Sequence, residues 1–156
     1  MKTPRIYAET SVFGGVFDEE FEAASRAFFE LVRRGRFTLL VSDICRKEIS
    51  RAPARVRAAF EEMLAFTQLV PIDERVLALR DAYISAGIIR AKWTEDAGHV
   101  AAATVAEANV LVSWNFRHIV HFDKVRVYNA INALHGYHAV DIRSPLEVVD
   151  YEDEDV

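Results

Sequence analysis

Short apolar runs alternate with segments of helical periodicity along this chain, and that alternation is the feature that most limits its fold. We expect strands over residues 5–8, 37–41, 67–72, 110–112 and 139–142. Between these runs, apolar residues recur every three or four positions, which is the spacing of an amphipathic helix. Residues 110–112 are continuously apolar, as is typical of a strand covered on both faces. Strands alternating with helices predict a three-layer α/β/α domain with a mostly parallel sheet.

Capping and turn residues divide the segments between the expected strands. We expect helices over residues 19–34, 43–49, 55–65, 73–84, 94–108 and, in part, 116–134, with a final turn from residue 144. Asp73 and Thr94 are suited to cap helix starts, and Gly87 is suited to end a helix. Pro53 fits a first helical turn and not a helix interior. The glycines at 14–15 predict a loop after the first strand.

The bulk composition indicates one domain without a membrane segment. The chain has 156 residues, 51% of them hydrophobic, which suits one domain over residues 1–149 and an acidic, solvated tail over 150–156. No apolar run approaches the roughly 20 residues needed to span a bilayer, and the first residues lack a signal-peptide pattern. The single cysteine, Cys45, fits a reducing compartment, so we expect a cytoplasmic protein with no membrane partner. The net charge of −5 excludes a global basic field, so nucleic-acid binding needs local patches or a metal.

Four polar residues fall where the expected sheet would bring them together. Glu9 follows the first strand, Glu48 lies on the helix after the second, and Asn115 follows the fourth. Asp96 begins the helix that leads into the fourth strand, and because this helix runs antiparallel to the strand, it starts near the strand's carboxyl end. Ligands of open parallel sheets bind outside the carboxyl ends of the strands. We therefore expect three carboxylates and one amide to converge at one edge.

Three neighbouring carboxylates repel one another, and their pKa values rise unless a cation is present. Mg²⁺ or Mn²⁺ is the usual hard cation for carboxylate oxygens, and such an ion keeps several waters. It activates a water and stabilises charge on a phosphate, which suits metal-dependent phosphodiester cleavage. Taken singly, Glu48 or Asp96 is equally well explained as a solvated or capping residue. Their joint placement with Glu9 favours the metal site.

Four short motifs occur in order along the chain, and together they carry a family resemblance. They are YAETSV over residues 7–12, Glu48-Ile49, DAGHVAAA over 96–103 and LVSWN over 111–115. In combination they resemble the PIN-domain family, in particular its VapC-type toxins of prokaryotic toxin–antitoxin pairs. The resemblance implies a parallel sheet of order 3-2-1-4-5 and an Mg²⁺- or Mn²⁺-dependent ribonuclease site with Glu9, Glu48 and Asp96 as its acids. It also implies frequent homodimers and a small antitoxin protein as partner.

The chain departs from the family's pattern at several positions. Glu9 is one methylene longer than the usual Asp, Ser113 replaces a Thr, Asn115 stands in place of the later acid, and His118 stands where many members carry another Asp. Two hypotheses therefore stay open. The first is a metal-dependent ribonuclease of toxin type with Asn115 as a fourth metal ligand. The second is a catalytically weak or inactive PIN-like module that acts by protein or RNA binding; a phosphoryl-transfer receiver fits less well, because it needs an Asp directly after the first strand.

Further polar residues lie beside the expected acids. Those that support the acids or contact substrate are Thr10, Ser11, His99 and Ser113, and those expected to contact RNA phosphates are Arg46, Lys47, Arg51, Arg90 and Lys92. His99 follows Asp96 by three residues, so it either orients that carboxylate or is simply packed and hydrogen-bonded. Trp114 either stacks a base or closes the core at the end of a strand. The basic residues are also explained as a solvated face.

Overall fold

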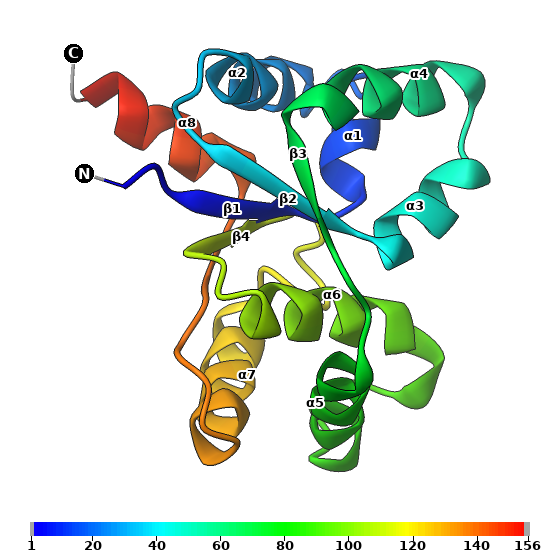
Figure 1. Ribbon diagram of the computed structural model, residues 1–156, viewed down its shortest axis with the longest axis vertical. Coiled ribbons are helices and arrows are strands. Elements are labelled where there is room, and N and C mark those ends of the chain that lie inside the picture. The colour runs from blue at the N-terminus through cyan, green and yellow to red at the C-terminus, as the bar shows by residue number, and fades with distance from the viewer. Residues whose placement is uncertain (1, 155–156) are drawn as a thin grey trace.

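The computed structural model describes residues 2–154, which contain a sheet of five parallel strands (Figure 1). The strands are β1 (Arg5–Ala8), β2 (Thr38–Ser42), β3 (Thr67–Val70), β4 (Val110–Val112) and β5 (Asp141–Arg143). Their order across the sheet is β3-β2-β1-β4-β5, and every neighbouring pair is parallel. The strand order and the parallel sheet implied by the resemblance are therefore confirmed. Central β1 lies between β2 and β4, so residues that follow these three strands are neighbours.

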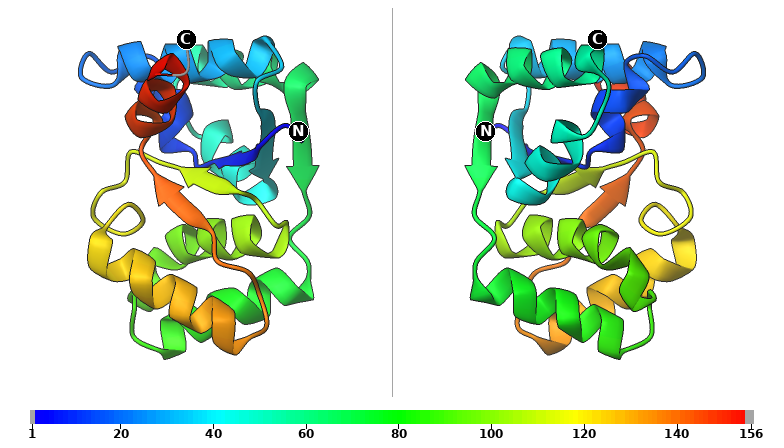
Figure 2. Two further views of the ribbon diagram at one scale, coloured as in Figure 1. Left: turned by 90° about the vertical axis from the view of Figure 1, so that its left-hand side faces the viewer. Right: turned by 90° about the vertical axis from the view of Figure 1, so that its right-hand side faces the viewer.

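Helices cover both faces of this sheet (Figure 1, Figure 2). They are α1 (Ser11–Gly15), α2 (Glu22–Arg33), α3 (Asp43–Ser50), α4 (Ala54–Met63), α5 (Glu74–Ser85), α6 (Thr94–Val105), α7 (Phe122–Leu134) and α8 (Pro145–Glu154). Tyr7, Leu40 and Leu111 pack against α5, α6 and α7 on one face. Ile6 and Leu39 pack with α1, α2, α4 and α8 on the other. Because side chains alternate along a strand, the same buried strands supply both cores, which confirms the three-layer architecture.

Residues 11–15 form the short helix α1 and not the predicted loop. The Ser11 N–H donates to the Glu9 carboxylate (3.1 Å), which stabilises the start of the turn. The glycine at position 15 serves close packing, because a Cβ on Gly15 would lie only 2.7 Å from Nε1 of Trp114. The glycine pair therefore marks a contact between α1 and the segment after β4.

Two other predicted boundaries were wrong. Thr94 does not cap α6, because the 3-10 turn η2 (Ala91–Trp93) runs directly into the helix and Thr94 already has helical φ and ψ of −58° and −30°. Helix α7 begins at Phe122 and not at residue 116, because Oδ1 of Asn115 accepts the His118 N–H (2.9 Å) and folds this segment into a turn. Strands β3 and β5 differ from their predicted ranges by only two residues at an end.

Three predicted helix boundaries are confirmed. Oδ1 of Asp73 accepts the N–H groups of Arg75 (3.0 Å) and Val76 (3.1 Å) and so caps α5. Pro53 directly precedes α4, where its missing N–H is not needed. Gly87 follows α5 with a φ of +79°, which suits a residue without a Cβ.

Helix α8 extends to Glu154, where the sequence predicted only a final turn. The helix crosses residue 150 without a break, so the backbone of the predicted tail begins as helix. Residues 155–156 and the exposure of the tail's side chains lie outside the described part of the chain, and the solvated tail stays a prediction. Within residues 2–154, no helix has both the length and the apolar composition needed to cross a membrane.

Candidate active site

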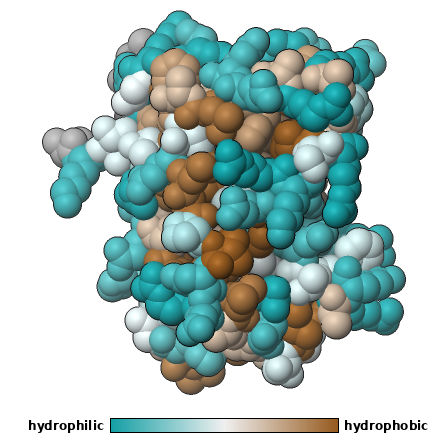
Figure 3. All heavy atoms as spheres, turned by 45° about the vertical axis from the view of Figure 1, so that its right-hand side comes forward, coloured by the Kyte–Doolittle hydropathy of each residue, from teal (hydrophilic) through white to brown (hydrophobic). Residues whose placement is uncertain are grey.

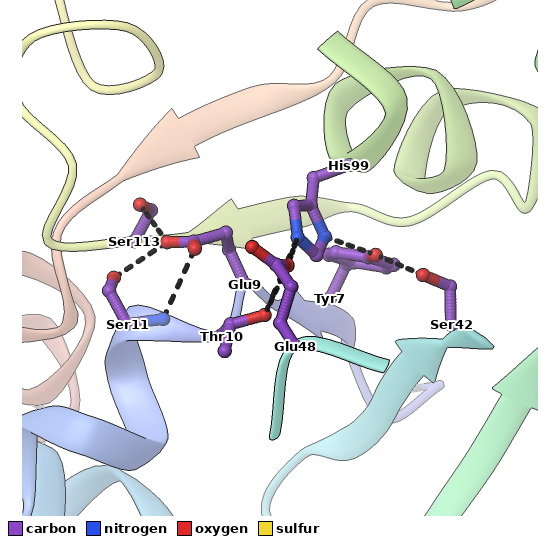
Figure 4. Close-up of polar contacts among 8 residues, drawn as sticks. All are labelled: Tyr7, Glu9, Thr10, Ser11, Ser42, Glu48, His99 and Ser113. Carbon is purple, nitrogen blue, oxygen red and sulfur yellow. Dashed lines mark hydrogen bonds and ion pairs between the residues drawn. The ribbon is translucent and has the colours of Figure 1, made fainter. Parts of the chain in front are cut away.

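Several of the polar residues singled out in the sequence meet at the carboxyl edge of the sheet, and Figure 4 draws Glu9, Glu48 and His99 among them. Glu9 directly follows β1, Ser113 directly follows β4, and Glu48 lies on α3, the helix after β2. Asp96 and His99 lie near the start of α6, on the opposite side of the sheet from α1. The site is therefore built by three strand ends and one helix start, as the topology predicted.

Glu9 is a buried carboxylate held by hydroxyl and amide donors. It is only 5% exposed. Its Oε1 accepts hydrogen bonds from the hydroxyls of Ser11 (2.6 Å) and Ser113 (2.6 Å), and its Oε2 accepts the Ser11 N–H (3.1 Å). These three donors compensate for the loss of water around the charge. Glu9 is thus fixed from both flanks, by α1 and by the end of β4.

Glu48 takes part in a chain of hydrogen bonds that crosses the core (Figure 4). Its Oε1 lies 2.5 Å from Nε2 of His99 and accepts the Thr10 hydroxyl at 2.8 Å. On the other side of the imidazole, Nδ1 lies 2.7 Å from the Tyr7 hydroxyl, which lies 2.7 Å from Oγ of Ser42. The side chains of His99, Tyr7 and Ser42 are fully buried. His99 therefore binds Glu48 and not Asp96, its neighbour on α6.

The protonation of this chain follows from its surroundings. Burial lowers the pKa of His99, but its hydrogen bond to Glu48 and the charges of Glu9, Glu48 and Asp96 outweigh burial and raise that pKa above its ordinary value. Burial likewise raises the pKa of Glu48, but the hydrogen bond from His99 and its charge outweigh burial and lower it. Both directions favour a carboxylate–imidazolium pair. The imidazolium then donates to Glu48 and to Tyr7, whose hydroxyl donates to Ser42.

Asp96 forms a second carboxylate–histidine pair. Nδ1 of His118 donates to its Oδ2 (2.9 Å), and both side chains are largely buried. The ring of His118 packs on Trp93, with the ring centroids 4.6 Å apart. Burial and the charge of Glu9 raise the pKa of Asp96 despite the hydrogen bond from His118. Asp96 is therefore the acid whose negative charge is least well balanced by protein groups.

The negative charges of all three carboxylates help to raise the pKa of His99, although only Glu48 binds its ring. Within residues 2–154, however, no three His, Cys, Asp or Glu side chains are spaced as metal ligands. Each acid is instead bound by protein groups: Glu9 by serines, and Glu48 and Asp96 by histidines. Oxygen donors and the raised pKa of Asp96 suit a hard divalent cation. The donor set fits such a cation in chemistry and charge, and the cation would compete with the two histidines.

Comparison with known proteins assigns this arrangement to a family. A family model described as PIN domain matches residues 6–117, the part of the chain that carries all three acids. The chain belongs to the PIN-domain family. The resemblance seen in the sequence is thereby confirmed.

Solved structures share the fold of this PIN domain. VapBC2 from Rickettsia felis bound to a DNA fragment from its promoter aligns with a TM-score of 0.57 and 12% identity, covering 90% of this chain and 98% of that chain. FitAcB from Neisseria gonorrhoeae aligns with a TM-score of 0.57 and 14% identity, covering 90% of this chain and 98% of that chain. At such identities the likeness concerns the fold alone. A search of curated proteins finds no match.

Asn115, the predicted fourth metal ligand of the PIN domain, supports its own loop. Its Oδ1 accepts the N–H groups of Arg117 (3.2 Å) and His118 (2.9 Å). Its N–H donates to Oγ of Ser113 (2.9 Å), the hydroxyl that also binds Glu9. Asn115 thus joins the loop to the site through hydrogen bonds, and its role as a metal ligand stays a prediction.

The basic residues expected to contact RNA are all exposed and flank two of the acids. They are Arg46, Lys47 and Arg51 around Glu48, and Arg90 and Lys92 before Asp96. The charge of Arg51 helps to lower the pKa of Glu48, and Nζ of Lys92 lies 5.0 Å from the ring centroid of Trp93. Figure 3 shows the side of the molecule that carries α3, where hydrophilic residues predominate around smaller hydrophobic areas. These side chains are available for phosphates, and their role stays a prediction.

Sequence reasoning missed Tyr7 and Ser42, the far end of the hydrogen-bond chain from Glu48. A tyrosine inside a buried strand needs a partner for its hydroxyl, and that signal was present. Trp114 proves to be packed, since its ring stacks on Phe21 with centroids 4.2 Å apart and its Nε1–H donates to Ser25 (2.8 Å). Cys45 is buried, and burial raises the pKa of its thiol to about 12, so it suits a core residue and not a nucleophile.

Proposed function

We propose that this PIN domain is a metal-dependent ribonuclease resembling the toxin of a type II toxin–antitoxin pair. In this proposal Glu9, Glu48 and Asp96 bind Mg²⁺ or Mn²⁺, with Asn115 as a further ligand. The observation that carries it is the placement of Glu9 after β1, Glu48 on α3 and Asp96 at the start of α6, at the edge where open parallel sheets bind ligands. When bound, the cation supplies an activated water and stabilises charge on the scissile phosphate.

The chain's own residues hold the acids and their charge. Glu9 is fixed by Ser11 and Ser113, which suits a ligand of constant position. Glu48 and Asp96 each have a histidine as hydrogen-bond partner before a cation binds. Exposed arginines and lysines beside Glu48 and Asp96 would hold the phosphates that flank the scissile bond. In this protein of net negative charge, RNA would thus be bound by local groups.

We further propose a cognate antitoxin protein as partner, a homodimer as the assembled form and the cytoplasm as the location. The support is the family resemblance, together with the shared fold of VapBC2 and FitAcB. Co-expression with the protein encoded beside it tests the first point: we expect a complex that suppresses cleavage. Light scattering of the purified chain tests the second, and a monomer at all concentrations would contradict it.

RNA cleavage by purified protein tests the ribonuclease proposal. We expect cleavage of a single-stranded RNA with Mg²⁺ or Mn²⁺, none in EDTA, and a loss of about a hundredfold or more for Asp96→Asn, since a metal ligand is removed. Glu95→Gln is the matched control, because it removes an exposed charge from the same helical turn and leaves Asp96 in place. Equal cleavage by the wild type and Asp96→Asn would show that a contaminant cuts the RNA.

A second candidate is a catalytically weak or inactive PIN module that acts by binding protein or RNA. The observation that favours it is the pairing of Glu48 and Asp96 with histidines, which leaves no group spaced as metal ligands within residues 2–154. Titration with Mn²⁺ followed by electron paramagnetic resonance separates the two. Saturable binding that is lost in Asp96→Asn supports the nuclease, and the absence of saturable binding supports the binding module.

A further inference from the structure

The loop after β4 connects two of the three carboxylates. At its start, Oγ of Ser113 donates to Glu9 (2.6 Å), and at its end Nδ1 of His118 donates to Asp96 (2.9 Å). Between these two contacts lie Phe116 and Arg117, which are both exposed. Phe116 is 49% exposed, so about half of its ring surface is open to a ligand. The loop whose two ends bind Glu9 and Asp96 thus carries an exposed aromatic ring and an exposed cation.

The ring of Phe116 rests on an ordered aromatic base. Its centroid lies 6.1 Å from that of Trp114 and 6.5 Å from that of Phe21, which itself stacks on Trp114. Trp114 is further fixed by the hydrogen bond from its Nε1–H to Ser25 and by the one from its backbone N–H to Oγ of Ser11 (2.9 Å). One edge of Phe116 is therefore supported by protein, while about half of its surface stays open to solvent.

Arg117 adds a charge without a partner of its own. In the described part of the chain its guanidinium forms no hydrogen bond, ion pair or ring contact, while its N–H is held by Oδ1 of Asn115 (3.2 Å). The backbone is therefore fixed and the side chain is free to bind. The acids beside this loop repel phosphates, so a cation here would help to retain a nucleic-acid strand near the site.

We propose that Phe116 and Arg117 form a subsite for single-stranded RNA, in which Phe116 stacks on an unpaired base and Arg117 binds an adjacent phosphate. The inference rests on the proposed ribonuclease function and assigns two residues to the binding of its substrate. Aromatic side chains bind single strands because every unpaired base offers a face, whereas the bases of a duplex are stacked on each other. The subsite therefore selects strandedness and not sequence, and it orients the chain across Glu9 and Asp96.

RNA binding in EDTA tests this subsite without cleavage. The probes are a short fluorescein-labelled adenosine-rich RNA and the same RNA annealed to its complement, followed by fluorescence anisotropy. We expect Phe116→Ala to weaken single-strand binding about five- to 150-fold, from the usual energy of base–aromatic stacking, with little change for the duplex. Phe116→Trp keeps a stacking face and restores single-strand binding. Arg117→Ala lowers the dependence of log affinity on log salt by about one unit, and Arg117→Lys retains it.

Phe66→Ala is the matched control. The exposed fraction of Phe66 (43%) is similar to that of Phe116 (49%). Phe66, however, lies in the turn before β3, at the opposite edge of the sheet. We expect the RNA affinity of Phe66→Ala to equal that of the wild type. Single-strand binding by Phe116→Ala equal to the wild type, or an equal loss for single strand and duplex, overturns the subsite while RNA cleavage by the wild type is untouched. No single-strand binding by the wild type in EDTA also overturns the subsite, whereas the ribonuclease proposal is decided separately by cleavage with Mg²⁺ or Mn²⁺.

Discussion

The two carboxylate–histidine pairs of this PIN domain have the same hydrogen bond, but the pKa values of their carboxylates shift in opposite directions. The pKa of Glu48 is lowered and that of Asp96 is raised, although each carboxylate accepts a hydrogen bond from an imidazole. Glu48 has additional donors and cations, since the Thr10 hydroxyl binds it at 2.8 Å and Arg51 adds positive charge. Asp96 has one imidazole partner, His118, and feels the negative charge of Glu9.

The histidines also differ in how they are held. His99 lies on α6 and is fully buried, with Tyr7 and Ser42 behind it. His118 lies on a loop, rests on Trp93 and is 12% exposed. The imidazole of the first pair is thus part of the core and that of the second lies on a loop, although the carboxylate of Glu48 (27% exposed) is more open than that of Asp96 (16%). We infer that the first pair contributes mainly to stability and that Asp96 is the carboxylate poised to gain most from a cation.

The largest expected effect comes from removing His99. In His99→Ala the carboxylate of Glu48 and the hydroxyl of Tyr7 lose their partner in a buried place, and breaking a buried pair in this way costs about 3–5 kcal/mol. Urea denaturation measures the change in the free energy of unfolding. His138→Ala, at an exposed loop histidine, is the control and is expected to unfold like the wild type. A loss below about 1 kcal/mol for His99→Ala would show that the pair is not part of the core.

A divalent cation should act through Asp96 rather than through the buried pair. We expect Mn²⁺ at a hundredfold excess over its dissociation constant to stabilise the wild type by about 2.7 kcal/mol, the value for a ligand that binds only the folded state. Asp96→Asn should lose this stabilisation, and Glu95→Gln should keep it. Thermal unfolding with Mn²⁺ and with EDTA gives the comparison. Equal stabilisation of Asp96→Asn and the wild type would place the cation elsewhere.

The acids of this comparison were predictable from the sequence, because the strands and helices that place them are recognisable from their own apolar patterns. Apolar periodicity predicts β1, β2 and β4 and the helices α3 and α6, and a parallel sheet brings Glu9, Glu48 and Asp96 to one edge. The order of the strands came from the family resemblance and not from periodicity. The short helix α1 was missed because its stability depends on distant contacts, such as that of Gly15 with Trp114.

The histidine partners were harder to predict, since they depend on how two helices approach. His99 reaches Glu48 because α6 packs closely on α3, where a Cβ on Gly98 would lie 2.7 Å from Cδ1 of Ile44. A glycine inside a helix costs stability, so its presence is a sign of close packing that the sequence offered. Nothing in the spacing of Asp96 and His118 indicates their contact, because the intervening chain includes β4 and a loop turned by Asn115.

Charge removal at the two acids should change stability in opposite directions at neutral pH. Because folding lowers the pKa of Glu48, its ionised form stabilises the fold at pH values above the pKa that Glu48 has in the unfolded chain. This stabilisation is lost as the pH falls through the pKa of Glu48 in the folded protein. The raised pKa of Asp96 has the opposite effect: protonated Asp96 stabilises the fold at pH values below its pKa in the unfolded chain. This stabilisation is lost as the pH rises through the pKa of Asp96 in the folded protein. We expect Glu48→Gln to lose about 1–2 kcal/mol at pH 7 and Asp96→Asn to gain up to about 1 kcal/mol in EDTA.

Urea denaturation of both variants at neutral and acidic pH measures these changes. The two differences from the wild type should shrink as the acids become protonated in the parent protein. Destabilisation by Asp96→Asn in EDTA at neutral pH would mean that the hydrogen bond from His118 outweighs burial and the charge of Glu9, and the contrast between the pairs would then be lost.

The smallest expected effect is that of His118. In His118→Ala, Asp96 loses its donor and Trp93 loses a ring contact, but His118 lies on a loop and is 12% exposed, so water can enter the space that it leaves and bind Asp96. We therefore expect a loss of about 1 kcal/mol, well below that of His99→Ala. His118→Asn, which keeps a side-chain donor, should recover part of it. The same urea denaturation series measures both losses. If His118→Ala and His99→Ala lose the same free energy of unfolding, the His118–Asp96 pair is as much a part of the core as the His99–Glu48 pair. Asp96 is then not free to exchange its histidine for a cation.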